Sequence, residues 1–224
     1  MNIIITGAGK GIGFETCKKL LHNPEHSILA ISRNIDALLE LMKSHQNLVP
    51  IAFDLEKDPF DDILKNINGT IDVLINNAGY LINKPFGAFK QSELERIMNV
   101  NFNAPFRLIQ TLLPRFSENA HIVNISSMGG FQGSAKFAGL SAYSSSKAAL
   151  ACLTECLAEE LKDRKIKVNC LCLGSVQTEM LEKAFPNYKA SMKPADIAEY
   201  IAHFALNAHN YMNGKIIPLS INTP

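Results

Sequence analysis

The sequence lacks any long apolar run. No stretch approaches the roughly 20 consecutive apolar residues that a membrane-spanning helix needs, so we expect no membrane partner. The first residues, Met1–Gly7, also lack the basic segment and cleavage site of a signal peptide, and they are typical of a β-strand.

An excess of charge of either sign is also missing. The 22 Lys and Arg residues nearly balance the 21 Asp and Glu residues, and the formal net charge is +1. This balance gives no electrostatic basis for binding nucleic acid or an anionic membrane surface, and we expect neither as a partner. Because 47% of the 224 residues are hydrophobic and 19% are charged, the composition indicates a globular protein, which we expect to form one domain over residues 1–224.

Cysteines are few, and their number is odd. Cys152 and Cys156 are one helical turn apart in an apolar pattern, and Cys170 and Cys172 alternate with apolar residues. No CxxC pair occurs and no histidine lies close to either pair, so the sequence predicts no metal site. We expect these thiols and Cys17 to be buried and reduced, which fits a cytoplasmic location.

Short apolar runs alternate with longer helical patterns along the whole chain. The predicted strands are Asn2–Thr6, Ser27–Ser32, Leu48–Phe53, Ile71–Asn76, His121–Ser126, Lys165–Leu171 and Lys215–Leu219. The predicted helices are Gly11–His22, Asp36–Ser44, Asp61–Asn66, Gln91–Phe116, Ala142–Asp163 and Pro194–Asn207, with Pro105 dividing the fourth in two. This alternation predicts an α/β fold with a doubly wound, Rossmann-type parallel sheet of about seven strands. Residues 178–193 lack clear periodicity, and we interpret them as a partly helical substrate loop.

A glycine-rich turn follows the first strand and opens the first helix. It consists of Thr6, Gly7, Ala8, Gly9, Lys10, Gly11, Ile12 and Gly13. Missing side chains let the backbone approach a pyrophosphate, and the helix N-terminus offers N–H groups to the anion. The same string could be a turn without a ligand, but its position in a βαβ unit favours dinucleotide binding.

Tyr143 and Lys147 are four residues apart in a predicted helix, so both side chains lie on one face. A free tyrosine is a poor base at neutral pH because its pKa is ~10. A nearby ammonium favours the phenolate, and lowering the pKa of a tyrosine from ~10 to ~7 takes about 4 kcal/mol of differential stabilisation. We expect Lys147, together with the positive ring of an oxidised nicotinamide if that is the dinucleotide at the glycine-rich turn, to supply much of that energy. Such spacing is common by chance and often means only a surface helix pair.

Further motifs in the same order resemble the classical short-chain dehydrogenase/reductase family, from Met1 to about Leu219. They are the spacing Thr-Gly-x-x-x-Gly-x-Gly, the run Asn76-Asn77-Ala78-Gly79, Asn101, the strand ending in Ser126-Ser127, and Tyr143-x-x-x-Lys147. The resemblance implies that Asn101, Ser127, Tyr143 and Lys147 are catalytic: Ser127 holds the substrate oxygen, and Asn101 holds a water next to Lys147. It also implies cofactor contacts from Asp54, Leu55, Asn77, Ala78, Gly79, Gly174, Val176 and Thr178. Two departures are Leu173, where the family usually has proline, and a lengthened loop from Met128 to Ala142.

The end of the second strand, Ser32, Arg33 and Asn34, indicates which dinucleotide binds. No acidic residue is present to accept from a ribose 2′-OH, whereas the Arg33 guanidinium suits a 2′-phosphate. Lys10 adds a second cation where NADP-preferring members of the family often have one. We therefore expect NADP(H), although both cations could be solvated surface groups.

The expected pocket is mostly apolar and has no arginine pair for a carboxylate. Its candidate residues are Tyr80, Leu81, Met128, Phe131, Phe137, Met180, Leu181 and Phe185, although any of them could be core. This predicts an NADP(H)-dependent reductase of an uncharged carbonyl compound, or the reverse alcohol oxidation. A 3-oxoacyl thioester reductase, a nucleotide-sugar epimerase and a catalytically silent NADP(H)-binding sensor or regulatory protein are alternatives. The family resemblance also implies a homodimer or homotetramer formed through residues 103–116 and 142–163.

Overall fold

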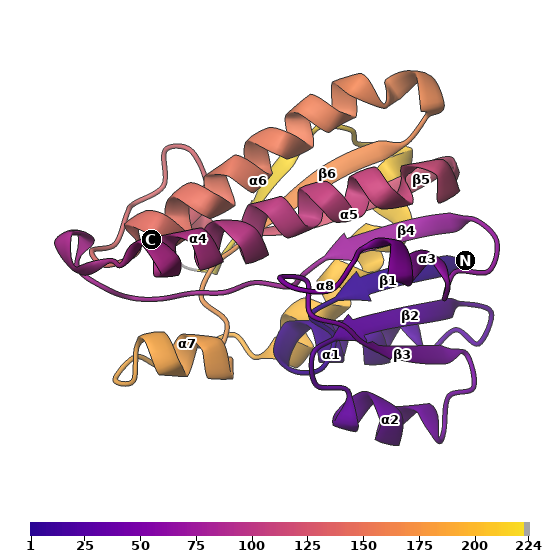
Figure 1. The fold of residues 1–224 in the computed structure, drawn as a ribbon, viewed down its shortest axis with the longest axis horizontal. Helices are drawn as coiled ribbons and strands as arrows, with labels where there is room; N and C mark the ends of the chain where they lie inside the picture. The colour runs from indigo at the N-terminus through magenta and orange to yellow at the C-terminus, as the bar shows by residue number, and fades with distance from the viewer. Residues whose placement is uncertain (222–224) are drawn as a thin grey trace.

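A parallel sheet of seven strands lies at the centre of the computed structural model, which describes residues 1–221 (Figure 1). The strand order is β3-β2-β1-β4-β5-β6-β7, and every pairing is parallel. The strands are β1 (Asn2–Thr6), β2 (Ser27–Ser32), β3 (Leu48–Ala52), β4 (Ile71–Asn76), β5 (Phe116–Ser127), β6 (Lys167–Leu173) and β7 (Ile216–Leu219). The chain runs outward from β1 to β3 and then returns to β4, so the order reverses between β1 and β4, where sheets of this kind bind ligands. The predicted fold class is confirmed.

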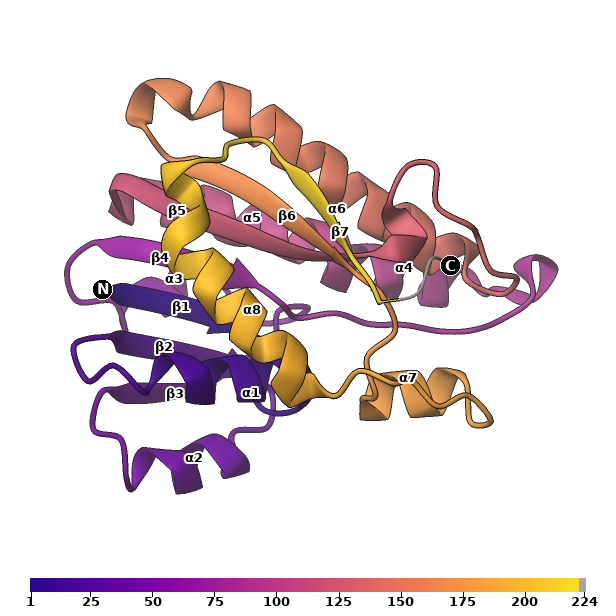
Figure 2. The same cartoon turned by 180° about the vertical axis from the view of Figure 1, so that it is seen from behind.

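Helices cover both faces of the sheet. One face, in front in Figure 1, carries α3 (Asp61–Leu64), α4 (Gln91–Met98), α5 (Ala104–Leu112) and α6 (Ser141–Glu160). The other, in front in Figure 2, carries α1 (Gly11–Leu20), α2 (Asp36–Met42) and α8 (Pro194–Asn207). The short α7 (Glu179–Ala184) lies beyond the carboxyl ends of the strands, inside the segment predicted to be a partly helical loop.

The helical segment predicted over residues 91–116 consists of two helices, as expected, but it ends earlier than predicted. Pro105 sits in the first turn of α5, and a π-helical turn at Asn99–Asn103, which was not predicted, joins α4 to α5. After a 3₁₀ turn at Leu113–Arg115 the chain enters β5 at Phe116, five residues earlier than predicted. The early part of β5 is polar and includes Glu118 and Asn119, so its sequence lacks the apolar run that marks the other buried strands.

The core consists of two main clusters of buried apolar side chains, one on each face of the sheet. Cys17, Cys170 and Cys172 are buried as expected, but Cys152 and Cys156 are exposed on α6, so that expectation is wrong for them. Small residues, alanine and serine, precede them on the same outer face of the helix. A pattern of hydrophobicity alone therefore predicts that this face is buried. All five thiols are free.

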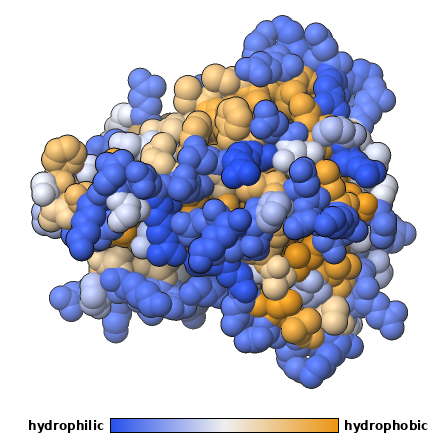
Figure 3. All heavy atoms as spheres, in the orientation of Figure 1, coloured by the Kyte–Doolittle hydropathy of each residue, from blue (hydrophilic) through white to orange (hydrophobic). Residues whose placement is uncertain are grey.

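Most of the surface in front in Figure 3 is hydrophilic, and apolar side chains gather along α6 at the top of that view. Within residues 1–221, no helix combines the length and the apolar character needed to cross a membrane. The predicted domain of residues 1–224 ends in three residues that lie outside the described part of the chain.

Candidate active site

A pocket of about 680 Å³ opens at the carboxyl ends of the strands. Its walls come from the turns after β1 to β6 and from α6 and α7. The pocket extends from Arg33 and Asp54 at one end to Tyr143 and Phe185 at the other. A cavity of this size suits an extended small-molecule ligand.

The glycine-rich turn combines residues that face the pocket with residues that shape the backbone. Gly7 and Gly11 have φ values of +67° and +57°, a region that favours glycine, and both line the pocket with Lys10 and Ile12. Gly9 and Gly13 are not on the pocket wall. A Cβ atom at Gly9 would lie 2.3 Å from the carbonyl oxygen of Asn34, and one at Gly13 would lie 2.4 Å from Nδ2 of Asn77. These two glycines therefore permit close packing rather than contact with a ligand.

Thr6 ties this turn to the end of β4. Its hydroxyl accepts hydrogen bonds from the backbone N–H groups of Asn77 and Ala78, each at 3.1 Å. The Asn77 side chain donates in return to the carbonyl oxygen of Thr6 at 3.0 Å. Thr6 is buried, whereas Asn77, Ala78 and Gly79 line the pocket. Asn77, Ala78 and Gly79 thus lie at the predicted site, whereas Thr6 holds the glycine-rich turn against the end of β4.

The residues at the end of β2 also divide into those that line the pocket and those that shape the backbone. Ser32 and Arg33 line the pocket, but Asn34 is not part of its wall. The Asn34 side chain accepts from the backbone N–H of Asp36 at 3.0 Å and donates to the Asp36 carboxylate at 2.9 Å. Asn34 therefore organises the start of α2.

Two glutamates accompany the predicted phosphate-binding cations. Lys10 Nζ lies 2.6 Å from Glu179 Oε2, and Arg33 lies 4.0 Å from Glu56 Oε2. Glu56 also accepts from Arg96 Nε at 3.2 Å. Glu56, Arg96 and Glu179 line the same pocket. The sequence did not predict them, because each is distant in sequence from its partner. Asp54 and Leu55 line this end of the pocket as expected.

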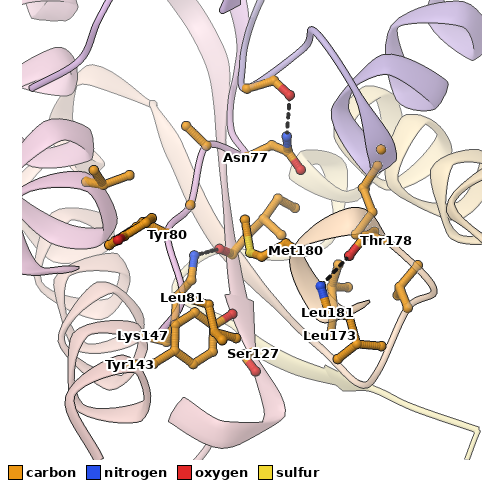
Figure 4. A pocket seen from close by; sticks show the side chains of 18 of the residues that line it. Asn77, Tyr80, Leu81, Ser127, Tyr143, Lys147, Leu173, Thr178, Met180 and Leu181 are labelled. Carbon is orange, nitrogen blue, oxygen red and sulfur yellow. Dashed lines mark hydrogen bonds between the residues drawn. The ribbon is translucent and has the colours of Figure 1, made fainter. Parts of the chain in front are cut away.

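Lys147 is buried and points into the site from α6 (Figure 4). Its Nζ atom donates a 2.8 Å hydrogen bond to the carbonyl oxygen of Ile125 on β5. Burial lowers the pKa of Lys147 to about 8, because the charged ammonium loses water.

Tyr143 and Ser127 lie beside Lys147 on the same wall of the pocket, across from Thr178 and Leu181 (Figure 4). Burial raises the pKa of the Tyr143 phenol to about 12, and its hydrogen bond with the Ser127 hydroxyl acts in the opposite direction. Among the side chains alone, the loss of hydration therefore dominates the pKa of Tyr143. The lowering expected from Lys147 together with an oxidised nicotinamide stays a prediction. The neighbouring Ser126 also lines the pocket, but its hydroxyl donates to the backbone carbonyl of Lys147 at 2.8 Å, which leaves Ser127 as the serine whose hydroxyl interacts with Tyr143.

Asn101 lies in the π-helical turn and is buried behind the pocket wall. Its Oδ1 accepts from the backbone N–H of Tyr80 at 2.7 Å, and its Nδ2 donates to the Tyr80 carbonyl at 2.9 Å and to Ser146 Oγ at 2.9 Å. These bonds fix the chain after β4 relative to α6. Both amide protons are engaged, so only a remaining lone pair of Oδ1 is available for the predicted water.

The residues predicted to contact a carboxamide follow β6. Gly174, Val176 and Thr178 line the pocket with Leu173. A Cβ atom at Gly174 would lie 2.4 Å from Ser220 Oγ, which explains the glycine by packing. The Thr178 hydroxyl accepts from the backbone N–H of Leu181 at 3.2 Å and so caps α7.

Seven of the eight predicted substrate-pocket residues line the cavity. Phe131 does not: it packs instead with Met128 against a small cluster of Ala151, Cys170 and Cys172, so its prediction is wrong. Leu140, Ser175 and Tyr188 were missed, and they complete this end of the pocket. Ser175 Oγ and the Tyr188 hydroxyl lie 2.9 Å apart, which joins the two ends of the α7 segment. In the described part of the chain, no group of three His, Cys, Asp or Glu side chains is placed to hold a metal ion.

Comparison with known proteins agrees with this architecture. The family described as short chain dehydrogenase matches residues 1–189. An uncharacterized oxidoreductase of Staphylococcus aureus (strain MW2) is 28% identical over 218 residues, covering 94% of this chain and 92% of the relative. The 3-oxoacyl-[acyl-carrier-protein] reductase of Thermotoga maritima is 29% identical over 234 residues, covering 96% and 94%.

Two solved structures show the same fold. ElxO with NADP bound superposes with a TM-score of 0.84 at 26% identity, covering 98% of this chain and 96% of that one. The 4-hydroxyisoleucine dehydrogenase complexed with NADH gives a TM-score of 0.86 at 26% identity, with the same coverage. The chain therefore belongs to the short-chain dehydrogenase/reductase family. It is an oxidoreductase, and its motifs are those of a classical member of the family.

Proposed function

We propose that this protein is an NADP(H)-dependent oxidoreductase that transfers a hydride between the nicotinamide and a carbonyl or alcohol substrate. Ketone reduction is its main direction, and Tyr143 is the acid/base. The observation that carries the proposal is the shared pocket: the wall with Tyr143, Lys147 and Ser127 is continuous with the end that holds Arg33 and Lys10.

The pocket suits a dinucleotide. At Gly11 a Cβ atom would meet nothing closer than Thr178 Cγ2 at 3.6 Å, so this part of the turn is open to a ligand. The turn opens α1, whose first N–H groups can hold a phosphate. Arg33 and Lys10 provide positive charge for a 2′-phosphate, and Asp54 and Leu55 provide an edge for adenine. ElxO, a relative of similar fold, is known with NADP bound, whereas another is known with NADH, so the choice of cofactor rests on the two cations.

The proposed chemistry divides between cofactor and protein. A bound nicotinamide supplies the hydride to the substrate carbon. Ser127 donates a hydrogen bond to the carbonyl oxygen and holds it next to the Tyr143 hydroxyl, which gives up its proton to that oxygen. The Lys147 ammonium stabilises the phenolate that remains, and Asn101 keeps the chain at Tyr80 in place beside it.

Tyr143 is in the protonation state that reduction requires. A phenol with a pKa of about 12 is protonated at neutral pH, which is the state that an acid catalyst needs. Alcohol oxidation needs the phenolate, so in that direction Tyr143 would act as a base only when its pKa is lowered by positive charge nearby, from Lys147 and from an oxidised nicotinamide if one is bound.

The substrate end of the pocket favours an uncharged, largely hydrophobic carbonyl compound. Its walls are formed by Leu81, Met128, Phe137, Leu140, Met180, Leu181 and Phe185. The polar groups here include Ser127, Tyr143, Ser175 and Tyr188, which suit a carbonyl or a hydroxyl rather than a carboxylate.

Reduction of a 3-oxoacyl thioester is a second candidate, favoured by the resemblance to the Thermotoga maritima reductase. The test is to follow NADPH consumption with a panel of apolar ketones and with a 3-oxoacyl thioester of a small thiol. Turnover of ketones supports the first proposal, and turnover of the thioester alone supports the second. Tight NADPH binding without turnover of any carbonyl would instead indicate a silent sensor or regulatory protein.

We further propose that the chain folds as one domain, acts in the cytoplasm with its thiols reduced, and self-associates through α5 and α6. The outer face of α6 exposes Ala148, Cys152 and Cys156, and α5 exposes Phe106. Such a face gains stability when a second copy covers it. Light scattering on the purified protein tests this: a dimer or tetramer that Phe106→Glu dissociates supports the proposal, and a wild-type monomer overturns it.

A further inference from the structure

Each cation proposed for the 2′-phosphate already has a carboxylate partner on the wall of the same pocket. Lys10 is paired with Glu179 at 2.6 Å, and Arg33 lies 4.0 Å from Glu56. A cofactor phosphate therefore meets lysine and arginine side chains that are not free. It has to replace a carboxylate at one or both of them.

Each glutamate also has a second cation. Glu179 accepts a hydrogen bond from Lys183, four residues further along α7, and Glu56 accepts from Arg96 at 3.2 Å. If Lys10 or Arg33 moves to a phosphate, its glutamate stays paired. The cost of breaking the first contact is therefore smaller than the cost of leaving a lone carboxylate.

We propose that Glu179 is a specificity-determining residue that competes with the 2′-phosphate of the cofactor for Lys10. In the pocket without a phosphate, Glu179 holds the Lys10 side chain. When NADPH binds, Lys10 turns to the phosphate, and Lys183 keeps Glu179 neutralised. With NADH nothing displaces Glu179, so its contact with Lys10 persists. This inference rests on the proposed use of NADP(H).

Charge and exposure agree with such an exchange. A phosphate monoester carries about −1.5 to −2 charges at neutral pH, against −1 for a carboxylate, so Lys10 gains by changing partners. Hydrogen bonds from Lys10 and Lys183 lower the pKa of Glu179 to about 2, so the carboxylate is ionised at any physiological pH. The side chains of Lys10 and Glu179 are 69% and 47% exposed, and solvent weakens a contact of this kind enough for it to be replaced.

The position of Glu179 also connects the cofactor end of the pocket to the substrate end. Glu179 is the first residue of α7, and the next two, Met180 and Leu181, line the apolar part of the pocket. The preceding Thr178 lies next to Gly11 of the phosphate turn, because a Cβ atom at Gly11 would be 3.6 Å from Thr178 Cγ2. The Lys10–Glu179 pair is thus a contact between the turn and the helix that forms part of the substrate wall.

The experiment measures the dissociation constants of NADPH and NADH by calorimetry for the wild type and for Glu179→Gln. Glutamine keeps the size of the side chain and removes the charge. We expect NADPH to bind about threefold more tightly to Glu179→Gln, the scale of an exposed ion pair, and NADH to change by much less. Glu15→Gln is the matched control, because Glu15 pairs with Lys18 on α1 at 2.9 Å and is not on the pocket wall. A gain of the same size in the control, or no gain in Glu179→Gln, overturns the inference.

Two double variants separate competition at Lys10 from a general effect of charge. In a Lys10→Met background, Glu179→Gln should no longer strengthen NADPH binding. Lys183→Met should weaken NADPH binding in the wild type, because Glu179 then depends on Lys10 alone, but not in Glu179→Gln. If the changes in NADPH binding free energy of the single variants simply add in both double variants, the inference is contradicted.

The same measurements keep this inference apart from the proposed cofactor. If the wild type binds NADH more tightly than NADPH, or if Lys10→Met leaves NADPH binding unchanged, the choice of NADP(H) or the role of Lys10 fails. If Lys10→Met weakens NADPH binding while Glu179→Gln changes nothing, the cofactor proposal stands and only the role of Glu179 is wrong.

Discussion

Lys147 Nζ donates its hydrogen bond to the carbonyl oxygen of Ile125, so the buried ammonium is anchored to the central strand β5 at a distance of 2.8 Å. The anchor fixes the charge in the pocket wall, next to Tyr143, and no carboxylate within residues 1–221 pairs with it. Burial without a carboxylate explains why the pKa of Lys147 falls to about 8 instead of rising. The ammonium needed beside the phenol is therefore retained only below that pH.

The first prediction follows for the pH dependence of ketone reduction. Because Lys147 is protonated below about pH 8 and neutral above it, kcat should fall as pH rises through about 8. Lys147→Met should lower kcat at neutral pH by about 10²-fold or more and remove this fall from the remaining activity. Steady-state rates measured with saturating NADPH test it. A wild-type kcat that stays constant across this pH contradicts the role of Lys147.

A second prediction concerns stability in acid. The buried His121 lies with Nδ1 2.9 Å from the carbonyl oxygen of Ala205 and Nε2 3.0 Å from Nδ2 of Asn169. This arrangement needs a neutral ring that donates at Nδ1 and accepts at Nε2. Burial lowers the pKa of His121 to about 4 from an ordinary value of 6.5, so the unfolded chain binds the proton first. Stability should be full above about pH 6.5 and should decline as pH falls toward about 4.

Urea unfolding at about pH 7 and about pH 5 measures this effect. We expect His121 to account for a loss of about 2 kcal/mol between the two conditions. The variant His121→Gln should lose less over the same range, and the exposed His203→Gln should behave as the wild type does. An identical loss in all three proteins contradicts the assignment to His121.

The third prediction tests the choice of cofactor at the end of β2. Arg33→Asp should weaken NADPH binding by at least about tenfold, because charge-assisted bonds to the phosphate are replaced by repulsion. NADH binding should improve, since the new carboxylate can accept from a ribose 2′-OH. Fluorescence titration with both cofactors measures the two changes. An unchanged ratio of affinities means that Arg33 does not choose the cofactor.

Fourth, the close packing at Gly9 predicts a steric effect without any loss of charge. The Cβ atom of Gly9→Ala would lie 2.3 Å from the Asn34 carbonyl and 2.5 Å from Ser32 Oγ, so the turn after β1 has to move. We expect a loss of about 1–3 kcal/mol in unfolding free energy together with weaker cofactor binding. Gly87→Ala is the control, because its Cβ would meet no atom within 4 Å. Wild-type stability of Gly9→Ala contradicts the packing described.

The parallel sheet of about seven strands and most of the pocket could be predicted because they depend on local patterns. Tyr143 and Lys147 share a helix, and the glycine turn is contiguous, so their spacing already fixes their relative placement. Glu179 and Lys10 are 169 residues apart, and nothing in the sequence near either one indicates the pair. The π-helical turn around Asn101 was missed because its residues keep helical periodicity.

The prediction for Phe131 failed for a different reason. An aromatic residue in the loop after Ser127 is equally compatible with a pocket wall and with the core, and tertiary packing decides between them. In the same way, Cys152 and Cys156 follow an apolar pattern, but the structure places that side of α6 at the surface.

The proton-donor role of Tyr143 is tested most directly by Tyr143→Phe, assayed for NADPH-dependent reduction of apolar ketones and for NADPH binding in parallel. Removing one hydroxyl leaves the ring and the walls of the pocket in place. Turnover should fall by about 10²–10⁴-fold while the dissociation constant of NADPH stays within about threefold of the wild type. Turnover close to that of the wild type, with NADPH still bound, would show that Tyr143 is not the proton donor.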